Sequence, residues 1–173
     1  MLHIYCGDGK GKTSAAAGLA VRALGSGWRV CLAQFLKGRE SGEIELLRTL
    51  PGMTVLREHN LDKFTFQMDQ AERAAALKAH NETLSQALEL LEQGRVELVV
   101  LDEILDALST ELADPVLVKR FAALAAGRRA PEVALTGRNP PDFLLEAADY
   151  ITEMNCRRHP YQKGIVARKG VEF

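Results

Sequence analysis

The sequence predicts an α/β protein built on one mostly parallel, doubly wound sheet. Short apolar segments alternate with longer segments of helical spacing along almost the whole chain, which is the pattern of βα units around a parallel sheet. The most continuous apolar segment, residues 96–101, lacks polar alternation, as expected for a strand that is buried on both faces. At 173 residues and 47% hydrophobic content, the chain fits a single domain over 1–173.

The first third of the chain predicts three strands with helices between them. Residues 2–6 are apolar and stop at a glycine-rich loop, and residues 13–24 are rich in alanine with helical spacing. Gly25 and Gly27 end this helix. The next predicted elements are a strand over 28–35, a helix over 42–50 and a strand over 53–56.

The rest of the chain continues the alternation. After a polar and aromatic loop over 59–68, Asp69 and Glu72 form a capping-box pattern at the start of a long helix that ends near Gly94. The elements that follow are a strand over 96–101, a helix that Asp114 and Pro115 begin and Gly127 ends, a strand over 132–136, a helix over 139–148, and one or two strands within 150–173 around a turn at His159 and Pro160. Ligands of such sheets bind at the carboxyl ends of the strands.

Composition excludes several classes of protein. The net charge of −1 argues against binding to nucleic acid or to an anionic membrane through charge. The apolar segments are far shorter than the roughly 20 residues that cross a bilayer, and no signal-peptide pattern follows Met1, so we expect a cytoplasmic protein. Cys6, Cys31 and Cys156 are too few and too scattered for a disulfide framework, and we expect all three to be reduced.

The strongest chemical motif lies between the first strand and the first helix. It reads Gly7, Asp8, Gly9, Lys10, Gly11, Lys12, Thr13, and Ser14 follows. In this position the loop amides and the helix N-terminus face an anion, Lys12 reaches the terminal phosphate oxygens, and Thr13 is placed for Mg²⁺ with Ser14 beside it. The usual pattern has its first glycine where this chain has Cys6. The order of strand, loop and helix nevertheless favours a nucleotide site and a sheet of the P-loop NTPase type over a glycine turn without a ligand.

Two further motifs follow later strands. Asp102 and Glu103 end the most apolar strand, where a Walker B carboxylate completes the Mg²⁺ shell. Either residue fits this role, and a pair of caps for the next helix would also explain them. Arg138 ends the strand over 132–136 at the same edge and could neutralise an anionic ligand, although an exposed loop arginine would look the same.

Aromatic and basic residues form weaker patterns. Phe64 and Phe66 lie two residues apart, so an extended chain would present both on one face, but packing under a long loop explains them equally well. His159 beside Pro160 fits a turn better than a metal ligand. The tail is basic, for which a solvated surface is the simpler explanation; its charged residues are Arg157, Arg158, Lys163, Arg168 and Lys169.

Together these motifs resemble the P-loop ATP:corrinoid adenosyltransferases over nearly the whole chain. The resemblance rests on the phosphate loop and on segments 34–38, 64–66, 100–103, 135–138, 159–161, 163–165 and 167–170. The displaced Gly7 is a feature of that family. The resemblance implies that the 5′-deoxyadenosyl group of ATP is transferred to the cobalt of a reduced corrinoid and triphosphate is released, in cobalamin biosynthesis or salvage.

The resemblance also implies roles for particular residues. The phosphate loop would grip the far end of the triphosphate, with Lys12 and Mg²⁺ stabilising the leaving group. Phe64 and Phe66 match two aromatic residues that displace the lower axial ligand of cob(II)alamin before its reduction, although the second is usually tryptophan. Arg138 could contact phosphate or a corrinoid side chain.

The same resemblance implies partners. A flavin-based electron donor and a homodimer are expected. Some relatives carry an N-terminal helix that covers the site. The short N-terminus of this chain implies that the site is closed by another segment or stays open.

Two other functions would fit the phosphate loop. In a P-loop NTPase or kinase, Asp102 or Glu103 would help water or a hydroxyl group attack the γ-phosphate. A carrier of nucleotide or corrinoid would have kept the fold without turnover, but the intact Lys12, Thr13 and Glu103 argue against it. The reaction products distinguish these possibilities.

Overall fold

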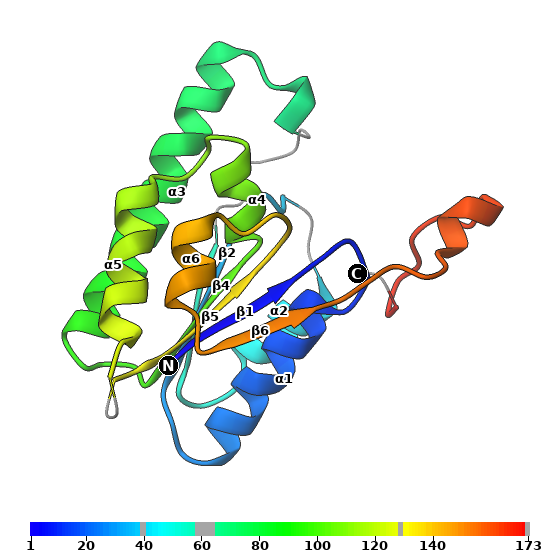
Figure 1. Ribbon diagram of the computed structural model, residues 1–173. Helices are drawn as coiled ribbons and strands as arrows, with labels where there is room; N and C mark the ends of the chain where they lie inside the picture. The colour runs from blue at the N-terminus through cyan, green and yellow to red at the C-terminus, as the bar shows by residue number, and fades with distance from the viewer. Residues whose placement is uncertain (39–40, 58–64, 128–129, 172–173) are drawn as a thin grey trace.

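The core of the protein is one parallel sheet, and the computed structural model describes residues 1–38, 41–57, 65–127 and 130–171. Its strands follow the order β3-β2-β4-β5-β1-β6, and every neighbouring pair is parallel (Figure 1). The strands are β1 (Leu2–Cys6), β2 (Val30–Gln34), β3 (Met53–Arg57), β4 (Leu98–Asp102), β5 (Glu132–Thr136) and β6 (Tyr150–Glu153). This confirms the predicted fold class.

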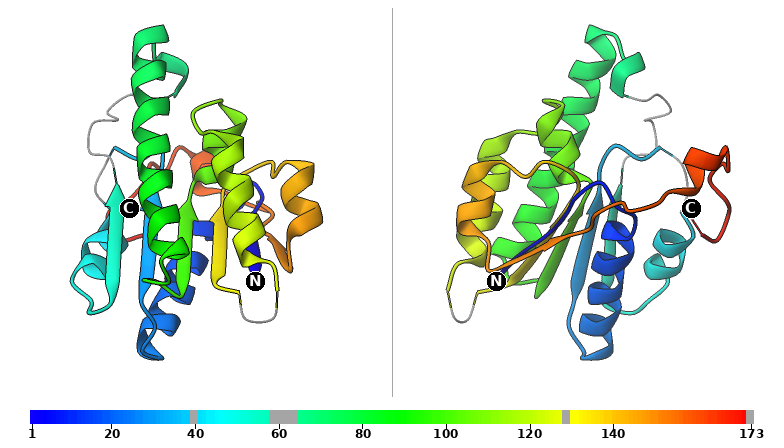
Figure 2. Two further views of the ribbon diagram at one scale, coloured as in Figure 1. Left: turned by 90° about the vertical axis from the view of Figure 1, so that its left-hand side faces the viewer. Right: turned by 45° about the vertical axis from the view of Figure 1, so that its right-hand side comes forward.

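Helices cover both faces of this sheet (Figures 1 and 2). One face packs on α1 (Lys12–Gly25) and α2 (Gly42–Arg48). The other packs on α3 (Gln70–Glu92), α4 (Ile104–Ser109), α5 (Pro115–Ala125) and α6 (Asp142–Ala147). Because side chains alternate along a strand, Val99 of β4 packs on the α3 side and Val100 on the α1 side. This burial on both faces explains why the strand has no polar alternation.

Strand order brings distant motifs to the same edge. β2 lies beside β4, so that Gln34 is paired with Asp102. β5 lies between β4 and β1, and its Thr136 is paired with Tyr5. The carboxyl ends of β2, β4 and β5 therefore meet near the loop that follows Cys6 of β1.

Two predicted helix starts are confirmed in detail. Asp69 accepts a hydrogen bond from the backbone N–H of Glu72 at 2.8 Å, and the Glu72 carboxylate accepts one from the backbone N–H of Asp69 at 3.0 Å. Asp114 caps α5 by accepting from the Val116 N–H at 2.8 Å, with Pro115 in the first turn. Each cap satisfies backbone donors that the first turn of a helix leaves unpaired.

Several predicted boundaries are wrong. β2 is shorter than 28–35, since Arg29 is bound through its backbone and side chain by Glu97 before the strand begins. The helix over 42–50 ends at Arg48. The six-residue α4 was not predicted, because so short a helix has no clear periodicity.

Of the one or two strands predicted within 150–173, the structure contains one, β6. Residues 154–171, the described part of the tail after β6, form no second strand. They contain the 3₁₀ turn η2 (Pro160–Lys163), and the tail extends away from the sheet (Figure 1). His159 accepts a hydrogen bond from the Tyr161 N–H at 3.2 Å, which supports its structural role in a turn.

All three cysteines are free thiols, as predicted, and burial raises the pKa of Cys31 to about 12. Within the described ranges, no helix is long and apolar enough to span a membrane.

Candidate functional site

The phosphate loop connects the end of β1 with the start of α1, as the sequence predicts. Gly7 has a φ of 103°, in the left-handed region that favours glycine. The backbone N–H of Gly9 donates to the carbonyl oxygen of Met154 at 2.7 Å, and a β-carbon on Gly9 would lie 2.6 Å from the same oxygen. The loop therefore needs small residues because the chain after β6 packs directly against it.

Side chains of the loop point to different places. Lys12 Nζ donates to the carbonyl oxygens of Gly7 at 2.8 Å and Gly9 at 2.9 Å. The Asp8 carboxylate accepts from the Cys156 N–H at 2.9 Å and so fixes the tail to the loop. Asp8, Lys10 and Ser14 are exposed. The ammonium of Lys12 thus lies over the loop where phosphate oxygens would bind.

Asp102 is a completely buried carboxylate at the end of β4. Thr136 donates to its Oδ1 at 2.7 Å, while Gln34 donates to its Oδ2 at 2.9 Å. Burial by itself raises the pKa of Asp102, but the charge of Lys37 and these hydrogen bonds outweigh burial and lower that pKa below its ordinary value. Asp102 is therefore a fixed anion.

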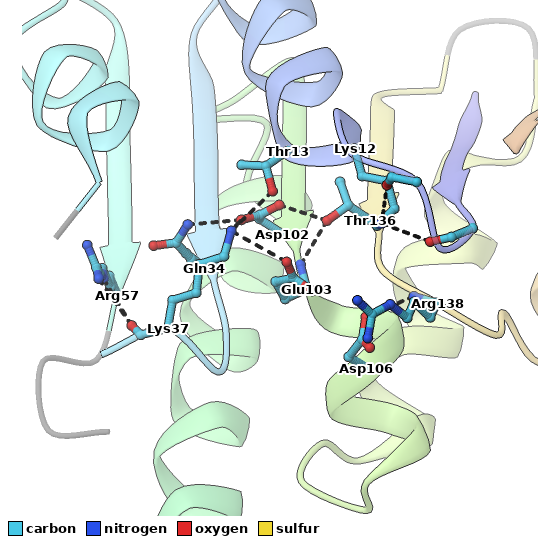
Figure 3. Close-up of polar contacts among 12 residues, drawn as sticks. Lys12, Thr13, Gln34, Lys37, Arg57, Asp102, Glu103, Asp106, Thr136 and Arg138 are labelled. Carbon is cyan, nitrogen blue, oxygen red and sulfur yellow. Dashed lines mark hydrogen bonds and ion pairs between the residues drawn. The ribbon is translucent and has the colours of Figure 1, made fainter. Parts of the chain in front are cut away.

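Lys37 brings a cation to the carboxylates (Figure 3). Its Nζ lies 3.1 Å from Thr13 Oγ1, 3.1 Å from Asp102 Oδ2 and 3.4 Å from Glu103 Oε1. Burial by itself lowers the pKa of Lys37, but the two carboxylates outweigh burial and raise that pKa above its ordinary value. The ammonium is therefore charged and lies between the phosphate loop and the end of β4.

Glu103 adopts a backbone conformation that is unusual for its residue type. Its φ of 63° is left-handed, and its N–H donates to the Thr136 hydroxyl at 2.8 Å. Burial raises the pKa of its carboxyl group; the charge of Lys37 opposes this, while Asp102 and Asp106 add to it. Glu103 occupies the N-cap position of α4 without a side-chain capping bond. Its side chain therefore contributes to the charged cluster rather than to a cap.

These oxygen atoms suit a magnesium ion. The Thr13 hydroxyl and the carboxylates of Asp102 and Glu103 surround one cationic nitrogen, that of Lys37, and hard oxygen donors are the ligands Mg²⁺ prefers. No group of three or more His, Cys, Asp or Glu side chains that could hold a metal ion occurs among the described residues, and this site offers two carboxylates and one hydroxyl group. A metal at this position would therefore complete its shell with nucleotide oxygens or water.

Arg138 lies at the same edge of the sheet, beside Asp106 (Figure 3). Its backbone N–H donates to Asp106 Oδ2 at 2.8 Å, and its side chain is exposed. The exposed side chain at this edge is open to contact with an anionic ligand.

Phe66 lies in the 3₁₀ turn η1 (Thr65–Gln67) and not in an extended segment, so the condition under which Phe64 and Phe66 would share one face is not met at Phe66. Its side chain is 82% exposed. Arg73 of α3 donates to the carbonyl oxygens of Thr65, at 3.5 Å, and Thr110. Phe66 borders an open cavity of about 340 Å³ between this turn and the end of α4. Phe64 falls outside the described residues.

Three polar residues of the site were not predicted as site residues from the sequence: Gln34, Lys37 and Thr136. Gln34 and Lys37 belong to a segment that carried the family resemblance, and Thr136 precedes Gly137 in another. All three lie at or just after the carboxyl ends of predicted strands, where ligands of parallel sheets bind, and this position could have indicated them as site residues.

Comparison with known proteins gives a consistent result. The model of the family described as "ATP:corrinoid adenosyltransferase BtuR/CobO/CobP" matches residues 1–173. A corrinoid adenosyltransferase of Pseudomonas aeruginosa is 38% identical over 180 residues, covering 100% of this chain and 83% of that protein. Corrinoid adenosyltransferases of a Sinorhizobium species and of Escherichia coli K12 are 34% and 30% identical, each over 100% of this chain and over 80% and 85% of the relative.

One solved structure shows a more distant similarity. Chain segments of EssC (ATPases 2 and 3) from Geobacillus thermodenitrificans superpose with a TM-score of 0.49 and 15% identity, covering 98% of this chain and 34% of that chain. The fold class follows from the sheet order, not from this likeness. The match of the family model over all residues, together with the relatives at 30% to 38% identity, shows that this chain belongs to the ATP:corrinoid adenosyltransferase family.

Proposed function

We propose that this protein transfers the 5′-deoxyadenosyl group of ATP to the cobalt of a reduced corrinoid. The electron pair of cobalt(I) forms the new bond to C5′. The bond from C5′ to oxygen breaks, and its electron pair leaves with inorganic triphosphate. The proposal rests on a phosphate loop that faces a buried Walker B carboxylate, in a chain whose whole length matches this family. Family membership does not favour the alternative of an NTPase or kinase.

The phosphate loop would hold the leaving group. In this proposal the triphosphate binds to the backbone amides of residues 7–13, with Ser14 beside them. Lys12, whose ammonium is held over the loop by two carbonyl oxygens, would stabilise the negative charge that grows as the C5′–O bond breaks. No general base is required, because the nucleophile is a metal centre without a proton to lose.

Thr13 and one or both of Asp102 and Glu103 would hold Mg²⁺. When bound, the ion would supply positive charge that stabilises the leaving triphosphate. Asp102 is the better-prepared ligand, since Thr136 and Gln34 fix its two oxygens and its pKa is lowered. Glu103 has a raised pKa and would act as the weaker or water-mediated partner.

The corrinoid would bind over the carboxyl edge of the sheet. Phe66, and Phe64 in the same segment, would form the apolar wedge against the lower face of the corrin, and the exposure of Phe66 supports this role. Arg138 would contact phosphate or a corrinoid side chain. A flavin-based donor for the reduction of cob(II)alamin, a homodimer and a cytoplasmic location complete the proposal.

An anaerobic assay tests the function. The protein is incubated with Mg-ATP and chemically reduced cob(I)alamin, and the light-sensitive cobalt–carbon product is followed by its absorbance. We expect adenosylated corrinoid and triphosphate to form in equal amounts. A parallel reaction without corrinoid should leave ATP intact, and formation of ADP and phosphate would contradict the proposal in favour of attack at the γ-phosphate.

A further inference from the structure

The position of Lys37 has a physical consequence for metal binding. Its ammonium lies at 3.1, 3.1 and 3.4 Å from the oxygen atoms of Thr13, Asp102 and Glu103 (Figure 3). These are the same oxygens that would hold Mg²⁺ in the proposed function. A lysine ammonium and a divalent metal cannot both lie among them, because the two positive charges would repel strongly at such distances.

Lys37 also balances the charge of the cluster. The side chain of Asp102 is 1% exposed and that of Glu103 is 24% exposed, and Lys37 forms ion pairs with both. Buried carboxylates are costly to leave without a positive partner. Lys12 of the phosphate loop donates instead to Gly7 and Gly9. Lys37 thus supplies the positive charge that Asp102 and Glu103 require.

The backbone of Lys37 is fixed, whereas its side chain has room to move. The Lys37 carbonyl oxygen accepts hydrogen bonds from Arg57 Nε at 3.3 Å and Nη2 at 3.2 Å. Leu36, just before it, has a left-handed φ of 58°, a strained conformation that the surrounding structure must maintain. The Lys37 side chain is 32% exposed, and its long flexible stem allows the ammonium to turn away from the carboxylates while its backbone stays in place.

We propose that Lys37 is a placeholder cation that competes with the divalent metal for Thr13, Asp102 and Glu103 and turns toward the triphosphate when the metal takes its place. The exchange keeps the carboxylates paired in both states. It also links metal binding to nucleotide binding, because bound phosphate provides new anionic partners for the displaced ammonium. The role of the triphosphate depends on the proposed function, whereas competition between Lys37 and the metal does not.

Binding of Mn²⁺ as a magnetic substitute for Mg²⁺ tests this competition. The nucleotide-free protein is titrated with Mn²⁺ and the free ion is measured by electron paramagnetic resonance. We expect Lys37→Met to bind Mn²⁺ at least about tenfold more tightly than the unchanged protein, because the competing charge is gone. Lys37→Arg keeps the charge and should remain as weak as the unchanged protein. Lys78→Met, on a 79% exposed lysine of α3, is the matched control and should have no effect.

A second measurement uses only the unchanged protein and therefore does not depend on whether a Lys37 variant folds stably. In the unchanged protein, Mg²⁺ alone should increase the labelling of Lys37 by an acylating reagent relative to Lys78, as followed by peptide mass spectrometry. Equal Mn²⁺ affinities of the protein and Lys37→Met, or labelling of Lys37 that saturating Mg²⁺ leaves unchanged, would overturn the proposal. Neither result depends on turnover, so failure of the adenosylation assay would be a separate finding about the proposed function.

Discussion

Asp102 illustrates how single residues prepare this site. Its carboxylate accepts hydrogen bonds from Thr136 and Gln34 and pairs with Lys37, so each oxygen has a fixed partner although the side chain is buried. Thr136 in turn accepts from the Glu103 N–H. One hydroxyl group therefore orients both carboxylate residues, through the side chain of one and the backbone of the other.

Lys12 is the residue whose loss should be most harmful to the chemical step. We expect Lys12→Ala to lower the rate of adenosylation at least about 100-fold, because a charge that stabilises the leaving group typically contributes that much or more. The rate is measured with chemically prepared cob(I)alamin, so that reduction does not limit it.

The control for this substitution is Lys78→Ala on the exposed face of α3. It should leave the rate unchanged. Turnover of Lys12→Ala at the rate of the unchanged protein would refute the leaving-group role, even if ATP affinity were lower.

At the scale of elements, short segments such as η1 and α4 position several residues of the proposed function. The turn η1 presents Phe66 to solvent, and Arg73 ties that turn and the end of α4 to the start of α3. Glu103 is the N-cap residue of α4. Phe66 and the carboxylate cluster are thus connected through one short helix.

Phe66 should matter for the reduction step more than for alkyl transfer. If its ring displaces the lower axial ligand, Phe66→Ala should slow adenosylation that starts from cob(II)alamin and a reductant by about tenfold or more, which is roughly 1.4 kcal/mol in the barrier. The reaction of pre-reduced cob(I)alamin should change much less.

Leu46→Ala provides a matched control, because Leu46 is also an exposed apolar residue, at 65%, but lies on α2. It should affect neither reaction. Equal losses from both cobalt states in Phe66→Ala would exclude the wedge and leave only a general contribution to corrinoid binding.

At the scale of the whole molecule, the two ends of the chain together shape the phosphate loop. β6 pairs with β1, and the segment after it packs on the loop through Met154 and Cys156. Residues almost 150 positions apart, Asp8 and Cys156, are hydrogen-bonded. The geometry of the loop therefore depends on the tail as well as on the motif.

Gly9→Ala tests this dependence. The added methyl group would lie 2.6 Å from the Met154 carbonyl oxygen, so we expect the free energy of unfolding to fall by about 1–3 kcal/mol and ATP affinity to fall with it. Denaturant unfolding and calorimetric titration measure the two effects.

Gly18→Ala is the matched control within α1. A β-carbon there meets nothing within 4 Å, and alanine in a helix interior should increase stability by about 0.5–1 kcal/mol. A Gly9→Ala protein with unchanged stability and ATP affinity would show that the tail does not constrain the loop.

Local patterns were sufficient for the regular part of this fold. The strand over 132–136 has the predicted bounds, the capping box at Asp69 and the cap at Asp114 are both present, and the phosphate loop lies between β1 and α1. Each of these features is specified by residues that are neighbours in sequence. The 3₁₀ turn at Phe66 and the short helix α4 were missed because three to six residues do not establish a periodicity.

The sequence by itself determined the fold class, the phosphate loop and the carboxylates that end β4, since each is a pattern within a few consecutive residues. Only the tertiary structure decided that Lys37, 65 residues before Asp102, lies between that carboxylate and Thr13. It also decided that Met154 leaves no room for a side chain at Gly9. These contacts follow from the strand order, which places β2 beside β4 and β6 beside β1. Periodicity predicts that a segment is a strand, but which strands become neighbours depends on how helices and strands of the whole chain pack together.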